Sequence, residues 1–589
     1  MEQGDIVLEV KDLSVSFDGR TVVDNVGYML RRGRTLGIVG ESGSGKSVSS
    51  LAIMGLLPSG GHCSVEGSIR FFGSPAWYAG VPACENDNKI HPTSSEADNP
   101  GIELVGLDED HFRHLRGNHI AMIFQEPMTS LNPVQRCGAQ VVEMLRLHEE
   151  VSKEEARRRA IALFNEVLLP RPEKIFDSYP HELSGGQKQR VMIAMALICN
   201  PDIIIADEPT TALDVTVQKT ILDLLRHLQQ QRNIAVIFIS HDLGVIAQVA
   251  DDIAVMYRGR IVEQGLARQV LANPRQPYTQ GLLACRPPLN ARPRRLPTVS
   301  DFMKESSTPS SPLTPLNPPT PSPPSAPLLS VRNLSVLFDL EKNLFGKPRK
   351  QLTAVDSISF DVFRGETFGL VGESGCGKTT LGRAILRLID SASGSITFDG
   401  LRLDTLSQRQ MRRLRQKIQI VFQDPYSSLN PRKTIGQAIM EPLLVSSNRH
   451  LSRSEARRRV VDLMDRVGLL PEWFDRYPHE FSGGQRQRVC IARALILQPD
   501  LVICDESVSA LDVSVQAQVL NLLNELKEQY GYTYIFISHD LSVVHFLSDR
   551  IMVMRRGALV ELAESDQLFS NPTTEYTKKL LDAIPKIDV

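Results

Sequence analysis

Short apolar runs recur along the chain and predict buried strands. Residues 35–39 (TLGIV), 203–206 (IIIA) and 235–239 (AVIFI) contain a threonine as their only polar residue. Continuous apolar runs of this length are typical of parallel strands that are covered on both faces. Stretches rich in helix-forming residues alternate with them, as at residues 47–56 and 187–197. This alternation predicts an α/β fold.

The whole pattern occurs twice. The runs at residues 501–504 and 534–538 repeat those at 203–206 and 235–239, and the mainly apolar run at 418–422 repeats one at 121–124. From residue 125 onward, matching positions of the two halves lie 298 residues apart, as Gln125 and Gln423 do. A constant offset of this kind indicates a duplicated fold.

Two insertions interrupt the correspondence. Lys46 and Lys378 lie 332 residues apart, so the first half has 34 extra residues before Gln125. We assign them to about residues 74–103, where Pro, Asn, Asp, Ser and Gly dominate and no apolar period survives. The second half has about 11 extra residues near 340–351. Both insertions fall between motifs, as surface loops do.

A glycine-rich motif, Gly-x-x-x-x-Gly-Lys-Ser/Thr, follows the first buried run of each half. Its glycines allow a turn in which several backbone N–H groups point at one phosphate, and the next helix adds its positive N-terminal end. The lysine then reaches the β- and γ-phosphates, and the hydroxyl binds Mg²⁺. The predicted binding residues of the two loops are Gly40, Ser42, Gly43, Gly45, Lys46, Ser47, Gly372, Ser374, Gly375, Gly377, Lys378 and Thr379.

Two adjacent carboxylates end a buried run in each half. Asp207 and Asp505 suit the ligand shell of Mg²⁺. Glu208 and Glu506 come one residue later, where a carboxylate can orient the attacking water and act as general base. Because both halves keep the pair, neither site is expected to be inactive.

Further polar residues follow other apolar runs. His241 and His539 each end a buried run, and their equal spacing in both halves favours contact with the γ-phosphate. Gln125 and Gln423 follow short apolar runs, where a glutamine can contact Mg²⁺ or the attacking water. We therefore place these four residues in the two predicted ATP sites.

A third motif, Ser-Gly-Gly-Gln, begins a predicted helix in each half. Its residues are Ser184, Gly185, Gly186, Gln187, Ser482, Gly483, Gly484 and Gln485. The N-terminus of that helix is a second anion-binding end, in addition to the one after the glycine-rich loop. The two helix N-termini of one half would bind the same ATP only if they lay side by side. A simpler arrangement is a head-to-tail pair, in which the Ser-Gly-Gly-Gln helix of each half caps the γ-phosphate bound by the other half. The sequence predicts this pair.

Composition bounds the class of protein. The 589 residues carry a formal net charge of −2, which argues against nucleic-acid binding through bulk electrostatics. The arginine runs at 157–159 and 457–459 have glutamates nearby and indicate a solvated helix face.

No apolar run reaches the roughly 18–20 residues of a membrane span, and the N-terminus lacks a signal-peptide pattern. No Cys-x-x-Cys pair occurs among the eight cysteines. These features predict a cytoplasmic protein.

We expect three parts. Residues 1–290 form a first domain, with the insertion at about 74–103 and a C-terminal extension at 266–290. Residues 291–328 form a Pro/Ser/Thr-rich linker, with nine prolines from Pro309 to Pro327. Residues 329–589 form the second domain.

These ordered motifs resemble the ATP-binding-cassette (ABC) family over nearly the whole chain. The resemblance implies two tandem ABC-type nucleotide-binding domains that pair head to tail. Each would have a RecA-like core, an antiparallel β subdomain and a helical signature subdomain. By position, Phe17 would stack on adenine in the first domain, and Phe338 or Phe345 in the second.

Finer features resemble the dipeptide/oligopeptide/nickel importer ATPases. They are residues 124–133 and 422–431 after the apolar runs, and Asn-Pro-Arg-Gln-Pro-Tyr-Thr at 273–279. One chain here resembles two fused subunits, as in glutathione and microcin importer ATPases. The cysteine-rich tail that holds an iron–sulfur cluster in some members is missing, so no such cluster is expected.

The resemblance implies an ATP- and Mg²⁺-dependent ATPase that energises import of a small solute, with peptides favoured. It implies two transmembrane permease subunits, an extracytoplasmic solute-binding protein and a peripheral location on the cytoplasmic face of the inner membrane. The alternative is a tandem-cassette, ribosome-associated translation factor. Those proteins join their cassettes by a long charged helix, which the prolines at 309–327 cannot form. The substrate, the relative turnover of the two sites and the role of residues 74–103 stay open.

Overall fold

The structure is a computed structural model. It describes residues 6–58, 61–73, 101–125, 130–210, 213–303, 326–342, 348–445, 451–509 and 511–585. Most of the predicted insertion, the proline-rich stretch and Phe345 lie outside these residues. The chain divides into two compact units, with residues 1–213 and 217–283 forming most of the first and residues 284–584 most of the second.

A six-stranded sheet forms the centre of the first unit, in the order β10-β9-β3-β8-β7-β6. Five strands are parallel, and β10 at one edge is antiparallel. All residues of β3, β7 and β8 are buried, as their apolar sequences predict. Because these strands are parallel, the residues that follow them meet at one edge of the sheet. The strands are β3 (Thr35–Val39), β6 (Ile120–Ile123), β7 (Ile203–Asp207), β8 (Ala235–Ser240), β9 (Asp252–Tyr257) and β10 (Arg260–Leu266).

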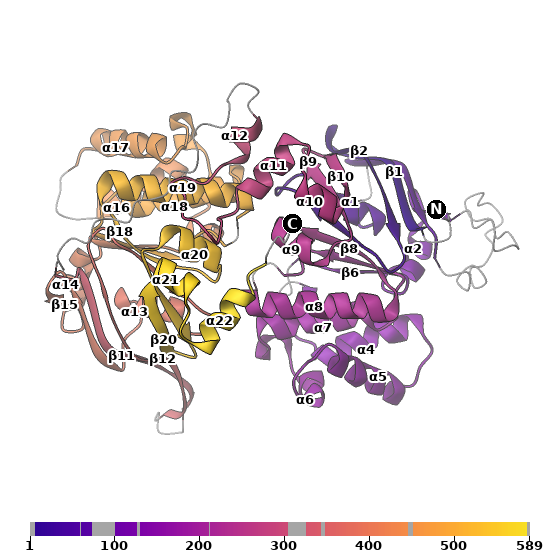
Figure 1. Ribbon diagram of the computed structural model, residues 1–589, viewed down its shortest axis with the longest axis horizontal. Helices are drawn as coiled ribbons and strands as arrows, with labels where there is room; N and C mark the ends of the chain where they lie inside the picture. The colour runs from indigo at the N-terminus through magenta and orange to yellow at the C-terminus, as the bar shows by residue number, and fades with distance from the viewer. Residues whose placement is uncertain are drawn as a thin grey trace, which may run out of the picture. The chain divides into compact units, whose positions relative to one another are not determined.

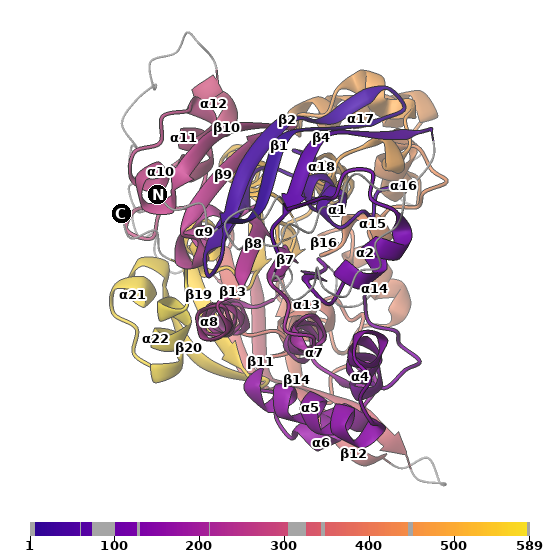
Figure 2. The ribbon, with the colours of Figure 1, turned by 90° about the vertical axis from the view of Figure 1, so that its right-hand side faces the viewer.

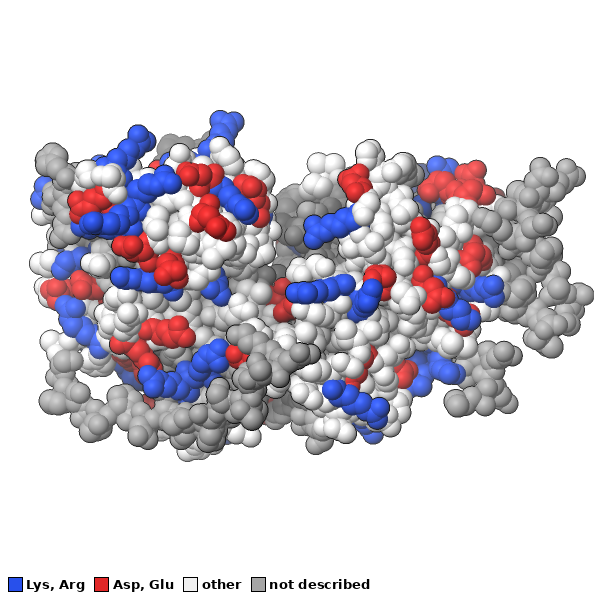
Figure 3. All heavy atoms as spheres, turned by 90° about the horizontal axis from the view of Figure 1, so that it is seen from above, with Lys and Arg blue, Asp and Glu red and all other residues white. Residues whose placement is uncertain are grey.

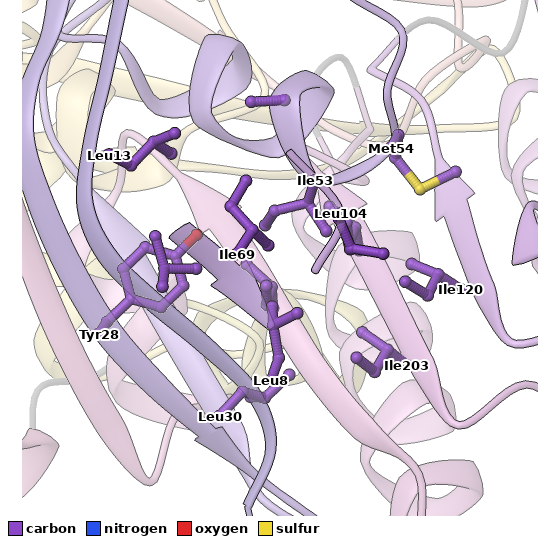
Figure 4. Close-up of a cluster of buried hydrophobic side chains, with 14 of the residues drawn as sticks. Leu8, Leu13, Tyr28, Leu30, Ile53, Met54, Ile69, Leu104, Ile120 and Ile203 are labelled. Carbon is purple, nitrogen blue, oxygen red and sulfur yellow. The ribbon is translucent and has the colours of Figure 1, made fainter. Parts of the chain in front are cut away.

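A second, antiparallel sheet covers the core, in the order β2-β1-β4-β5. Figure 4 shows Leu8, Tyr28 and Ile69 of this sheet in one cluster with Ile120 and Ile203 of the central sheet. All five are at most 3% exposed. A fully buried aliphatic side chain contributes roughly 1.5–3 kcal/mol, so this cluster holds the two sheets together. The strands are β1 (Ile6–Phe17), β2 (Arg20–Arg31), β4 (Cys63–Phe71) and β5 (Ile102–Glu103).

Helices complete the first unit. Helices α4, α5 and α6 gather at the end of the unit away from β1 and β2 (Figures 1 and 2). The helices are α1 (Lys46–Ile53), α2 (Glu109–Leu115), α4 (Cys137–His148), α5 (Lys153–Glu166), α6 (Pro172–Asp177), α7 (Gly185–Leu197), α8 (Val215–Arg232), α9 (Leu243–Val249), α10 (Ala267–Ala272) and α11 (Pro277–Ala284).

The second unit repeats this architecture. Its sheets have the orders β16-β17-β18-β13-β19-β20 and β12-β11-β14-β15. The strands are β11 (Leu329–Lys342), β12 (Pro348–Val362), β13 (Thr367–Val371), β14 (Ser393–Phe398), β15 (Leu401–Arg402), β16 (Ile418–Val421), β17 (Leu501–Asp505), β18 (Thr533–Ile537), β19 (Arg550–Arg555) and β20 (Ala558–Glu564). The extra residues of this half lengthen its first hairpin, since β11 and β12 have 14 and 15 residues where β1 and β2 have 12 each. The predicted α/β fold with two cassette-like domains is confirmed.

The helices of the second unit largely match those of the first, with α12 as an addition before β11. They are α12 (Val299–Met303), α13 (Lys378–Ile385), α14 (Gln408–Leu414), α15 (Pro425–Ser428), α16 (Ile435–Val445), α17 (Arg453–Arg466), α18 (Gly483–Leu495), α19 (Val513–Tyr530), α20 (Leu541–Leu547), α21 (Ser565–Ser570) and α22 (Glu575–Asp582). No helix within the described residues is long and apolar enough to cross a membrane.

Residues 284–303, here the anchored segment, belong to the second unit. Leu296 is fully buried, and its N–H donates to Oδ1 of Asn521 in α19 at 2.8 Å. Asn521 Nδ2 donates to the Leu296 carbonyl at 2.9 Å, so one side-chain amide satisfies both backbone groups of Leu296. Arg294 pairs with Glu528 at 2.7 Å. Residues 291–303, which the composition assigns to a linker, are therefore folded onto this unit.

Charged side chains of both signs are interspersed over the face of the molecule seen in Figure 3. The arginine run in α5 illustrates this. Arg157 pairs with Asp177 at 3.2 Å, and Arg159 pairs with Glu155 at 2.8 Å. The Arg157 guanidinium also lies over the Phe176 ring, 4.2 Å from its centroid. The arginines thus form the ion-paired, solvated helix face that the sequence predicts.

Candidate functional site

The glycine-rich loop of each unit leads from β3 or β13 into a helix whose first residue is the lysine. Gly45 and Gly377 cap these helices with φ values of 101° and 105°, in the left-handed region that favours glycine. At Gly43, with φ 79°, a Cβ atom would meet nothing within 4 Å. The loop therefore leaves an open cradle in front of the helix N-terminus, as a bound phosphate requires.

The lysine side chains fold back across these loops. Lys46 Nζ donates to the carbonyls of Gly40 at 2.8 Å and Glu41 at 2.9 Å. Lys378 Nζ makes the matching bonds at 2.7 and 3.0 Å. Both lysines are about 95% buried. The loop carbonyls hold each ammonium group at the cradle, where it can meet phosphate oxygens.

A hydroxyl and a carboxylate lie together beside each loop. Ser47 Oγ donates to Asp207 Oδ1 at 3.1 Å, and Thr379 Oγ1 donates to Asp505 Oδ1 at 2.9 Å. Burial raises the pKa of both aspartates, although these hydrogen bonds oppose the shift. A desolvated carboxylate beside a hydroxyl oxygen provides the hard oxygen ligands that Mg²⁺ prefers. These residues fit the predicted magnesium site.

Three predicted residues meet at the carboxylate of Glu208. Its Oε2 accepts a hydrogen bond from Gln125 Nε2 at 3.1 Å and lies 3.1 Å from His241 Nδ1. These side chains follow β7, β6 and β8, whose carboxyl ends share one edge of the sheet. The structure thus brings together residues that lie far apart in the sequence.

The second unit repeats the cluster around Glu506. Gln423 Nε2 donates to Glu506 Oε2 at 2.6 Å, and His539 Nδ1 lies 3.5 Å from the same oxygen. Burial alone would raise the pKa of Glu506, but the hydrogen bond and charge of His539, aided by Lys378, lower it. The carboxylate therefore stays ionised, which is the state of a general base that accepts a proton.

Both glutamates have an unusual backbone conformation that the sequence does not reveal. Glu208 and Glu506 have φ of 47°, in the left-handed region that few non-glycine residues adopt. Their N–H groups donate to the backbone carbonyls of Ile239 at 3.0 Å and Ile537 at 2.9 Å, each on the neighbouring strand. Strain of this kind concentrates at active sites, where the surrounding fold holds the residue in place.

The Ser-Gly-Gly-Gln residues begin α7 and α18, as predicted. Ser184 Oγ accepts from the Gln187 N–H at 3.4 Å, and Gln187 Oε1 accepts from the Ser184 N–H at 3.0 Å. Ser482 and Gln485 form the same reciprocal cap. Both serines are exposed, so each helix N-terminus is presented at the surface of its unit.

The aromatic residues assigned to adenine have different surroundings. Phe17 ends β1 and packs, partly buried, against the hydrophobic core. Phe338 in β11 is 36% exposed. Phe345 lies outside the described residues, so the adenine-stacking role of all three stays a prediction.

Two family models match this chain. The family described as "ABC transporter" matches residues 23–211 and 355–509. The family described as "Oligopeptide/dipeptide transporter, C-terminal region" matches residues 262–310 and 560–589. A solved structure titled as the dimeric structure of a bacterial ABC transporter cassette is 26% identical, covers 40% of this chain and 98% of its own, and has a TM-score of 0.37.

Curated relatives match almost from end to end. The glutathione import ATP-binding protein GsiA of Pectobacterium atrosepticum is 47% identical over 99% of this chain and 90% of its own length. The protein of the same name from Escherichia coli K12 is 47% identical over 98% and 89%. These matches favour the importer over the ribosome-associated alternative. The chain therefore belongs to the ABC transporter family, as an ATPase with two cassettes that are each followed by an oligopeptide/dipeptide transporter C-terminal region.

Proposed function

We propose that this protein energises the import of a peptide-like solute, with glutathione-like compounds the first to test, through separate membrane permeases. One observation carries the proposal. A histidine lies beside the predicted general base in both units, and each cassette is followed by a region of the oligopeptide/dipeptide transporter type. The relatives are named as glutathione import ATP-binding proteins, which supports the same class of solute.

At each site, the loop N–H groups and the lysine bind the phosphates of ATP. Ser47 and Asp207 in the first unit, with Thr379 and Asp505 in the second, would hold Mg²⁺. The bound metal ion neutralises charge on the β- and γ-phosphate oxygens.

Glu208 and Glu506 act as the general bases. Each orients the attacking water and accepts its proton. Their glutamine and histidine partners hold the two carboxylates in place.

We further propose that the serine of the Ser-Gly-Gly-Gln motif in each unit, Ser184 or Ser482, completes the ATP site of the other unit. The exposed, capped N-termini of α7 and α18 support this idea. A helix N-terminus carries about half a positive charge, which stabilises a phosphate placed before it. ATP would hold the two cassettes together, and hydrolysis would release them.

The partners implied are two transmembrane permease subunits and an extracytoplasmic solute-binding protein, with this chain at the cytoplasmic face of the inner membrane. Movement would pass to the permeases through the segments that follow Gln125 and Gln423, because these glutamines donate hydrogen bonds to the general bases Glu208 and Glu506.

The test is to tag the chain at its native level, solubilise the membranes gently and identify the co-purifying proteins. Two multi-span proteins are expected. Ribosomal particles without a membrane protein would overturn the proposal. Uptake of radiolabelled glutathione and of dipeptides, in cells with and without this chain, then separates the two solute classes. A solute outside both classes would reject the peptide-like assignment while leaving the importer intact.

A further inference from the structure

The extension that follows each cassette contacts the nucleotide-binding loop. In the first unit it follows β10, and α10 leads into a turn at residues 273–276. Glu263 of β10 holds this turn, because its carboxylate accepts from the N–H groups of Arg275 at 2.7 Å and Gln276 at 3.2 Å. Gln280 Nε2 also donates to the Pro274 carbonyl at 2.9 Å. The turn fixes the direction in which α11 leaves the sheet.

This turn aims Tyr278 of α11 at the loop. The tyrosine is 2% exposed, and its hydroxyl accepts a hydrogen bond of 3.1 Å from the N–H of Glu41, 237 residues earlier. Its ring packs against Tyr257 at the end of β9, with centroids 4.3 Å apart. Helix and sheet therefore both fix the position of the phenol.

Glu41 is the second residue of the glycine-rich loop, and it is held from both sides. Its N–H donates to Tyr278, and its carbonyl accepts from Lys46 Nζ at 2.9 Å. A change in the orientation of Glu41 would therefore move the carbonyl that places the phosphate-binding ammonium group. Glu41 thus links the extension to the phosphate site.

The second unit has the same parts in a different arrangement. Glu561 of β20 accepts five hydrogen bonds, from the N–H and hydroxyl groups of Thr573 and Thr574 and from the Thr577 hydroxyl. Burial alone would raise its pKa, but these bonds, led by that of Thr577, lower it to about 2. The turn is thus held at least as firmly as its first-unit counterpart.

The tyrosine of this second extension does not complete the contact. Tyr576 is 9% exposed and lies beside the Glu373 backbone, and burial, reinforced by the Glu373 carboxylate, raises its pKa. The Glu373 backbone acts on this hydroxyl in the direction that lowers its pKa. The contact nevertheless falls outside hydrogen-bond geometry among the residues that the structure describes. The Arg555 guanidinium covers its ring at 4.7 Å, at the position that Tyr257 occupies in the first unit.

We propose that Tyr278 is a positioning residue for ATP binding. Through Glu41 it holds the first glycine-rich loop in the form that presents Lys46 to the phosphates. In the second site the corresponding contact between Tyr576 and Glu373 is weaker, so that site depends less on the tyrosine hydroxyl. The C-terminal extension thereby acts more strongly on nucleotide affinity in the first half of the chain, which makes the two ATP sites unequal.

The experiment compares Tyr278→Phe with Tyr576→Phe in the full chain. Each change removes one hydroxyl and keeps the ring, so packing is preserved and both melting temperatures should stay close to that of the parent. ATP occupancy of each site is measured with a photoreactive ATP analogue, followed by proteolysis and identification of the labelled peptide.

We expect Tyr278→Phe to weaken binding at the Lys46 site about fivefold, which corresponds to about 1 kcal/mol. The apparent KM for ATP at that site should rise while kcat changes less than twofold. Tyr576→Phe should leave both affinities within twofold. Unchanged affinity in Tyr278→Phe, an equal loss in both variants, or a kcat that falls in step with the melting temperature would each overturn the proposal. None of these results depends on the identity of the imported solute.

Discussion

His241 Nδ1 lies 3.1 Å from the Glu208 carboxylate, although 33 residues separate the two in the chain. The contact exists because β7 and β8 are parallel neighbours that end at the same edge of the sheet. The equivalent pair, His539 and Glu506, stands 3.5 Å apart in the second unit. In each unit the histidine therefore lies beside the glutamate that is predicted to act as the general base.

The general-base assignment predicts the phenotype of the double variant Glu208→Gln with Glu506→Gln. An amide keeps the shape of each side chain but does not accept a proton, so ATP hydrolysis should fall about 10²–10⁴-fold. ATP binding should persist, because the lysines and magnesium ligands remain. Phosphate release and equilibrium nucleotide binding measure the two effects. Turnover near the parental rate would remove both glutamates from this role.

The head-to-tail proposal predicts that Ser482→Arg impairs the site built on Lys46 and spares the site built on Lys378. The arginine would block the exposed N-terminus of α18 without disturbing the buried core. Ser184→Arg is the matched variant and should have the opposite effect. Site-resolved nucleotide trapping reads out both, and the reverse pattern would refute the shared-site arrangement.

A buried histidine makes stability depend on pH. His545 in α20 is 3% exposed, and burial, reinforced by the charge of Arg292, lowers its pKa to about 4 against the opposing charge of Asp566. The unfolded chain takes up this proton near pH 6.5, whereas the folded chain does so only near pH 4. The contribution of neutral His545 to the free energy of unfolding is therefore fully present above about pH 6.5. It is lost as the pH falls toward 4, by roughly 3 kcal/mol in all.

The variant His545→Gln tests this dependence. It keeps a hydrogen-bonding partner for Ser565, which lies 3.0 Å from the imidazole, but removes the titrating group. Urea unfolding of the second unit, followed by pulse proteolysis at pH 7 and at pH 4.5, should show a smaller loss of stability in the variant than in the parent. Equal losses would show that another group is responsible.

The anchored segment predicts a local unfolding phenotype. Asn521→Leu removes the side-chain amide that satisfies both backbone groups of Leu296, so two buried polar groups lose their partner. Each such loss costs about 1–3 kcal/mol. Hydrogen exchange at residues 292–301 should rise by at least tenfold. The variant Glu528→Gln, which weakens only the exposed pair with Arg294, is the control and should change exchange little.

Much of the fold could be predicted because the central strands β3, β7 and β8 are almost entirely apolar. The run at 35–39 is β3, and the helix predicted at 187–197 is α7 with two more residues at its start. The helix predicted at 47–56 ends earlier, at Ile53, because Gly55 turns the chain with φ 59°. The paired motifs likewise named the residues that gather at the sheet edges.

Other features depend on contacts between distant residues and leave no local pattern. The hydrogen bond from Glu41 to Tyr278 spans the unit, and nothing near either residue predicts it. The stretch at 291–303 has a composition typical of a linker, yet a single asparagine in α19 holds it. The left-handed backbone of Glu208 follows from the strand beside it rather than from its own residue type.

The anchored segment also bears on how the chain would survive a break. Residues 284–303 are folded into the second unit but are joined by peptide bonds to the end of the first. A protease that cuts between residues 304 and 325 would leave this segment on the amino-terminal fragment, with Leu296 still held by Asn521. The amino-terminal fragment would then carry a segment that completes the fold of the other fragment, as in a protein rebuilt from two complementary pieces.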